Sequence, residues 1–167
     1  MLDFILFNPA VALAFYGSLA GLALWATWHD FDLLAVGVVL AFCFVISNII
    51  GLTVAVANQP GPYSAIQILI AAMAVQAWGE HRSRKLIALV CVSLASVGAN
   101  IAFVLNFPPD QRQIFLWELT TNMCFAGECL LASWMGIAHG YRVGRFSARV
   151  LPDRGVAQPD AAREIEP

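Results

Sequence analysis

Residues 33–79 read LLAVGVVLAFCFVISNIIGLTVAVANQPGPYSAIQILIAAMAVQAWG and contain no Asp, Glu, Lys or Arg. An α-helix of about 20 residues crosses the roughly 30 Å hydrocarbon core of a bilayer, so this run is too long for one span. The sequence Gln59-Pro60-Gly61-Pro62 interrupts it, because proline cannot continue a helix and restricts the residue before it. The stretch therefore predicts two membrane spans, at about 33–57 and 63–79, joined by a short turn.

Charged residues divide the rest of the chain in the same way. Residues 4–28 and 86–107 are free of formal charge, and a further apolar segment covers about 113–139. We therefore expect an all-α, polytopic integral membrane protein with five transmembrane helices. Residues 1–141 are predicted to form the bundle, and residues 142–167 a basic cytoplasmic flank followed by a disordered tail, because this end has few large apolar residues.

The composition agrees with lipid as the main solvent. Of the 167 residues, 60% are hydrophobic and 12% are charged, whereas a soluble domain has about 25% charged residues. The formal net charge is -2, which excludes nucleic-acid binding driven by overall basicity. The expected partners are the lipid bilayer and either further copies of the chain or subunits of a membrane complex.

The basic residues predict the orientation, because Lys and Arg collect on cytoplasmic flanks. Five spans place eight of the nine basic residues on the side of the carboxyl terminus and leave Arg112 on the other side. The amino terminus is therefore expected outside and the carboxyl terminus in the cytoplasm. The basic residues expected at lipid headgroups are Arg82, Arg84, Lys85, Arg142, Arg145 and Arg149. Aromatic residues near the predicted span ends are also expected at the membrane interface: Trp25, Trp28, Trp78, Trp117 and Tyr141.

Two carboxyl groups, those of Glu118 and Glu128, fall inside the last predicted span. At 100° per residue, Thr121 and Asn122 share one helical face with them. An ionisable group in hydrocarbon costs about 2.5–3.5 kcal/mol on insertion scales, so this face is expected to avoid lipid.

Two interpretations of this polar face remain open. It could line a channel, relay protons or contact another subunit. Alternatively, Glu118 could reach the headgroups, and Glu128 could be protonated and bonded to polar side chains that join neighbouring helices. The side chains expected to make such interhelical contacts are Asn48, Gln67, Gln76 and Asn100.

Other patterns indicate packing rather than chemistry. The pairs Gly17/Gly21, Gly37/Ala41 and Gly136/Gly140 have the four-residue spacing that lets helix backbones approach closely. The sequence contains no GxSxG, phosphate-loop or HExxH motif, and its cysteines and histidines lack metal-ligand spacing. We therefore expect neither an enzyme nor a bound cofactor or metal.

The final predicted span contains the run TNMCFAGECLL at residues 121–131. It resembles a pattern, roughly N-x-L-F-A-L-Q-x-L-L, in the last helix of small multi-spanning membrane proteins of tailed bacteriophages and prophages. The matching residues are Asn122, Phe125, Ala126, Leu130 and Leu131, and Glu128 stands where that pattern has Gln. The resemblance implies a phage or prophage origin and a location in the bacterial inner membrane.

Three functions follow as expectations. The first is a holin-like protein that oligomerises into a pore and permeabilises the membrane, suggested by the resemblance, the small size and the amphipathic last span. The second is a non-enzymatic accessory, assembly or docking subunit of a membrane complex. The third is a small proton-coupled transporter that uses Glu128.

Overall fold

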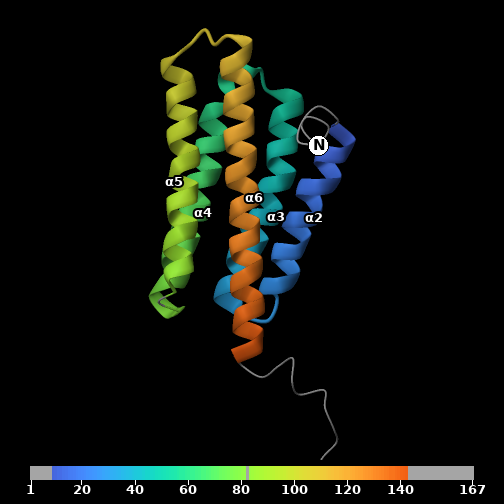
Figure 1. Cartoon of the computed structure of the whole chain (residues 1–167), viewed down its shortest axis with the longest axis vertical. Coiled ribbons are helices and arrows are strands. Elements are labelled where there is room, and N and C mark those ends of the chain that lie inside the picture. The colour runs from blue at the N-terminus through green and yellow to red at the C-terminus, as the bar shows by residue number, and fades with distance from the viewer. Residues whose placement is uncertain (1–8, 82, 143–167) are drawn as a thin grey trace, which may run out of the picture.

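A computed structural model of the chain describes residues 9–81 and 83–142, and all regular secondary structure in this part is helical (Figure 1). Residues 4–8 of the first predicted span, Arg82, Arg145, Arg149 and the remainder of the predicted tail lie outside the described residues. The elements in chain order are α2 (Pro9–Thr27), α3 (Phe31–Thr53), the short 3-10 helix η1 (Val56–Asn58), α4 (Pro60–His81), α5 (Arg84–Leu105) and α6 (Gln111–Arg142).

Local chemistry sets the helix ends. The Asp30 carboxylate accepts hydrogen bonds from the backbone N–H groups of Asp32 and Leu33, so it caps the start of α3. Pro60 is the first residue of α4, a position where a missing N–H costs nothing. The predicted span 33–57 is corrected at its end, because α3 stops at Thr53 and residues 56–58 form η1 ahead of the proline pair.

The five α-helices run alternately up and down along one common axis (Figure 1). The α3–α4 and α5–α6 connections lie at one end of the bundle, and the α2–α3 and α4–α5 connections lie at the other, with the end of α6. We call these the α5–α6 end and the α4–α5 end. Each helix packs on its neighbour in sequence, and α6 also packs on α2 and α3, so the bundle closes into a ring.

Glycine permits the closest helix approaches near the α4–α5 end. A Cβ atom at Gly136 of α6 would overlap the backbone carbonyl of Ala26 on α2. A Cβ atom at Gly37 of α3 would overlap Oγ1 of Thr27, and it would lie 3.2 Å from Cα of Leu24. These two residues, from two of the three predicted pairs, therefore allow α2 to pack tightly against both α3 and α6. In the third pair, a Cβ atom at Gly21 would meet no atom within 4 Å.

Three helices are long and apolar enough to cross a membrane: Ala10–Thr27, Phe31–Thr53 and Arg84–Leu105. The helices α4 and α6 are also long, at 22 and 32 residues, but they are less apolar. In α6 the difference comes from Arg112, Glu118 and Glu128. The chain is therefore an all-helical bundle that can enter a membrane by at least these three helices.

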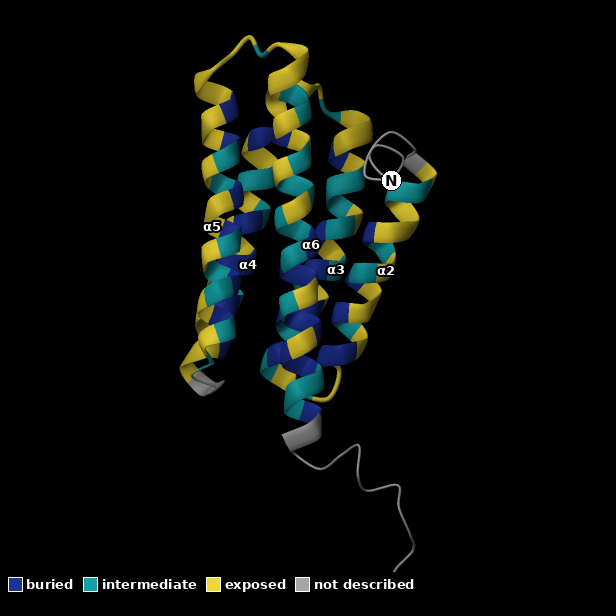
Figure 2. Cartoon of the chain, viewed as in Figure 1, coloured by how far each residue is buried: buried dark blue, intermediate teal, exposed yellow. Residues whose placement is uncertain are grey.

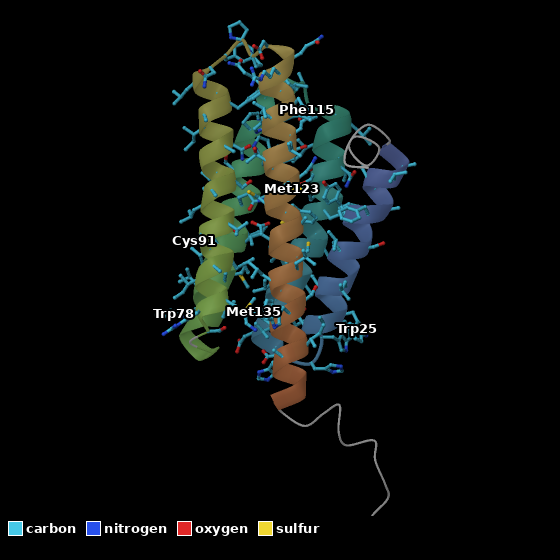
Figure 3. All side chains as sticks on the ribbon, viewed as in Figure 1. Trp25, Trp78, Cys91, Phe115, Met123 and Met135 are labelled. Carbon is cyan, nitrogen blue, oxygen red and sulfur yellow. The ribbon has the colours of Figure 1, made fainter. Side chains whose placement is uncertain are left out.

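The outer surface of the bundle is rich in large apolar side chains, and the buried side chains face its interior (Figure 2). Trp25 and Trp78 lie near the α4–α5 end (Figure 3), and both are exposed as a membrane-interface residue would be. Trp117 was expected at an interface for the same reason. It is instead buried, because its ring stacks on Phe103 and its N–H has a partner inside the bundle.

The interior is divided into two halves of different chemistry. Toward the α4–α5 end it is an apolar core, which includes Leu33, Leu40, Ile70, Leu86 and Met135. Leu33, Leu86 and Met135 also line a small, partly open pocket of about 80 Å³ at that end. Toward the α5–α6 end it contains polar side chains and a cavity. Glu128 lies at the boundary, next to the buried core residue Cys129 in sequence.

Candidate functional site

The side chain of Glu128 is completely buried in the middle of the bundle, at 0% exposure. On the α5 side, the Ser93 hydroxyl donates a hydrogen bond of 2.7 Å to Oε1 of Glu128. On the α4 side, Nε2 of Gln67 donates to Oε2 at 3.5 Å. Both carboxyl oxygens therefore have a donor, and the group joins three helices.

A second polar contact joins α5 and α6 nearer the α5–α6 end. The indole N–H of Trp117 donates a hydrogen bond of 2.8 Å to Oδ1 of Asn100, and both side chains are buried. The Trp117 ring stacks on Phe103 with 4.5 Å between centroids and an interplanar angle of 30°. This contact fixes the indole as one wall of the space between the helices.

That space is a partly open cavity of about 420 Å³, lined by residues of α2, α3, η1, α4, α5 and α6. Its size falls in the range of roughly 300–1,000 Å³ that is typical of small-molecule sites. The polar face predicted on the last span contributes Glu118, Thr121 and Asn122 to its wall, and Gln67 links the cavity to Glu128. The structure therefore brings the predicted face together on the inside of a single chain.

Glu118 differs from Glu128 in its surroundings. Its side chain is exposed and lines the cavity, and it forms no ion pair with another described residue. Thr121, one turn further along, bonds back to its own helix through the carbonyl oxygens of Trp117 and Glu118. The two carboxyl groups thus occupy two depths, one on the open cavity and one beneath it.

Aromatic rings form much of the remaining wall. Phe44 and Phe125 stack with 6.4 Å between centroids, and Tyr63 and Trp117 lie 5.9 Å apart. The ring of Tyr16 meets Phe125 edge to face. All five rings line the cavity, and its described lining contains no Lys, Arg or His.

Three of the lining residues carry a buried polar atom that has no hydrogen-bond partner among the described residues. These atoms are Oε1 of Gln67, Oγ of Ser96 and the hydroxyl oxygen of Tyr16. The three side chains are 7%, 1% and 7% exposed. A buried polar group without a partner costs free energy, so such groups commonly mark a place where a ligand or solvent binds.

The residues predicted to link helices separate into two groups. Gln67 and Asn100 make hydrogen bonds between helices. The amide of Asn48 instead reaches one turn back along α3, where it donates to the Phe44 carbonyl at 2.7 Å, although the residue lines the cavity. Gln76 is exposed on α4, away from this cluster.

The described basic residues predicted at headgroups lie at the α4–α5 end. Arg84 begins α5 and is exposed, and Nζ of Lys85 lies 4.3 Å from the ring centroid of Trp134. Arg142 is the last residue of α6. His139 and Asp30, whose Nε2 and Oδ2 atoms are 3.0 Å apart, join α6 to the cap of α3 at the same end.

Sequence reasoning missed Ser93, Ser96 and the two tyrosines of the cavity. Serine and tyrosine are ordinary residues of membrane helices, and nothing local distinguishes these from the others. The available signal was helical spacing, because Ser93, Ser96 and Asn100 recur on one face of α5 and are all buried.

No known protein family, curated protein or solved structure matches this chain.

Proposed function

We propose that the chain is a five-span protein of a bacterial inner membrane, of phage or prophage type, that acts as a small proton-coupled transporter. In this proposal Glu128 takes up and releases the proton. Solute enters the partly open cavity within one copy of the chain.

The observation that carries this proposal is the position of Glu128. A carboxyl group in the middle of a membrane bundle is costly and usually marks an ion or proton path. Here it is fully buried and contacts Gln67, which lines the partly open cavity toward the α5–α6 end. Toward the α4–α5 end Glu128 borders the apolar core. A proton site between a polar cavity and an apolar core is what we expect of a carrier that is open toward one side.

The holin-like pore is less well supported by this geometry. A pore between copies needs a polar surface facing the neighbouring copy. Glu118, Thr121 and Asn122 face a cavity inside one chain, and the described outer surface is rich in exposed apolar side chains such as Phe42, Leu52 and Trp134. The polar face of α6 would have to turn outward to line such a pore.

The arrangement of the helix ends supports the proposed five spans and their orientation. Arg84, Lys85 and Arg142 lie at the end of the bundle where α4 meets α5 and α6 terminates. Basic residues favour the cytoplasmic side. We therefore propose that this end faces the cytoplasm, so that the cavity and Glu118 open toward the outside.

Liposomes that contain the purified full chain and two trapped dyes test the function. Pyranine reports internal pH, and carboxyfluorescein reports any large opening. Under a potassium diffusion potential, the wild-type chain should move protons while carboxyfluorescein is retained. Glu128→Gln should abolish proton movement, whereas Asp32→Asn, which removes a carboxylate at the α4–α5 end, should preserve it.

The same assay separates the alternatives. Release of carboxyfluorescein by both the wild-type chain and Glu128→Gln would establish a holin-like pore in place of a carrier. Movement of neither protons nor dye would exclude both. An accessory or docking role would then be favoured if deletion of residues 152–167 abolished recovery of a partner while membrane insertion was retained.

A further inference from the structure

The chemistry of the cavity wall selects a class of solute. The wall has the Glu118 carboxylate on one side and no basic residue in its described lining. An anion entering it would meet a like charge without a compensating cation. A neutral solute would gain nothing from the carboxylate, whereas a cation would gain a direct electrostatic partner in a partly dehydrated site.

The polar atoms without partners indicate where a polar group of the solute could bind. Oε1 of Gln67 is an amide oxygen, so it can only accept a hydrogen bond. The Nε2 group of the same side chain already donates to Glu128. The hydroxyl groups of Ser96 and Tyr16 can either accept or donate. All three residues line the cavity. The cavity can therefore hydrogen-bond a polar group of the solute at these positions, and only Oε1 of Gln67 requires that group to be a donor.

The aromatic wall specifies the body of the solute. Rings of Tyr63 and Trp117 lie on the side of α4 and α6, and rings of Phe44 and Phe125 lie on the side of α3 and α6. Such rings bury flat apolar groups, and their faces attract cations. The cavity of about 420 Å³ is large enough for a compact ring system and too large for an inorganic cation alone.

We propose that this cavity binds a protonated aromatic amine, with the ammonium group at Glu118 and the ring against the aromatic wall. This inference deepens the proposed function, because it rests on the cavity being the solute site of a carrier. It assigns the charge contact to Glu118 and leaves Glu128 to the proton.

Equilibrium dialysis of the full chain in detergent micelles tests the proposal with three probes that share one ring system. Naphthylmethylammonium is cationic, naphthylmethanol is neutral and naphthylacetate is anionic. A compartment with micelles alone corrects for partition into detergent. The ammonium should bind about 10- to 100-fold more tightly than the alcohol, the range expected for a charge-assisted hydrogen bond, and the acetate should bind weakest.

Substitutions in the cavity wall identify the side chain that contacts the ammonium group. Glu118→Gln should reduce binding of the ammonium to that of the alcohol, and the matched variant Asp32→Asn should leave it unchanged. Because Glu118 is exposed and unpaired among the described residues, its replacement should not prevent folding. Gln67→Leu changes the cavity wall without removing a charge, so it should leave the preference for the ammonium over the alcohol unchanged.

Three results would overturn the inference: equal binding of all three probes, binding of none, or an unchanged preference in Glu118→Gln. Tighter binding of the trimethylated ammonium, which has no N–H donor, would also contradict it, because the ammonium would then not donate a hydrogen bond to Glu118. Proton movement in liposomes with loss of probe binding would refute this inference alone. Probe binding without proton movement would refute only the proposed carrier function.

Discussion

The hydrogen bond between Ser93 and Glu128 should couple helices α5 and α6 energetically. Its O–O distance is 2.7 Å, and both side chains are fully buried. Hydrogen bonds between membrane helices average about 0.6 kcal/mol and reach about 1.7 kcal/mol. This bond is short and ends on a carboxyl group, so it belongs to the upper part of that range.

A double-mutant cycle isolates this bond from the other effects of each substitution. We expect a coupling energy of about 1–1.5 kcal/mol between Ser93→Ala and Glu128→Leu. The cycle removes the separate cost of the apolar replacement at residue 128. Reversible unfolding in mixed SDS micelles, followed by the loss of helical circular dichroism, supplies the four free energies of unfolding.

Ser133→Ala provides the matched control for this cycle. The Ser133 hydroxyl is also buried on α6, but it donates to the Cys129 carbonyl of its own helix at 2.7 Å. Its effect should therefore add to that of Glu128→Leu within about 0.3–0.5 kcal/mol. A coupling between Ser93 and Glu128 no larger than this control value would refute the reasoning, because the bond would then contribute nothing to the bundle.

Two further predictions concern the packing of α6. Gly136→Ala should lower the free energy of unfolding by about 1–3 kcal/mol, because the added Cβ overlaps the Ala26 carbonyl. Gly21→Ala should have little effect, because its Cβ meets no atom within 4 Å. The same unfolding experiment in SDS micelles measures both variants. Trp117→Phe should lower the free energy of unfolding by about 1 kcal/mol, because it removes the hydrogen bond to Asn100 while keeping the stack on Phe103. The ring of Trp134 is exposed, so an equal loss of stability in Trp134→Phe would contradict that explanation.

Much of the helical layout could be predicted from the sequence, because it depends on local signals. Charge-free runs between polar clusters predict where the helices lie, and Pro60 predicts the break between α3 and α4. The end of α3 at Thr53 could not be placed in the same way. The residues from Val54 to Asn58 are as apolar as a span, and only their turn geometry shows that the helix has stopped.

The candidate site could be predicted only in part. Helical periodicity places Glu118, Thr121, Asn122 and Glu128 on one face of α6. In the structure Glu128 is buried, Thr121 and Asn122 are half-buried, and Glu118 is exposed on the cavity wall. Periodicity could not give the partners of Glu128, because Ser93 and Gln67 come from other helices and depend on how these rotate about their axes. The aromatic wall of the cavity could not be predicted for the same reason. Trp117 in particular was predicted at the membrane interface, whereas it packs inside the bundle.

The proposed carrier needs a site inside one copy of the chain that opens toward the outside, and cysteine labelling tests this most directly. In a chain whose native cysteines are replaced by alanine, Asn122→Cys on the cavity wall should react with a membrane-impermeant maleimide in spheroplasts. It should not react in inverted membrane vesicles. Ala132→Cys, which lies in the apolar core at 0% exposure, should stay unlabelled in both. Labelling of Asn122→Cys from both sides, or from the cytoplasmic side alone, would contradict the account.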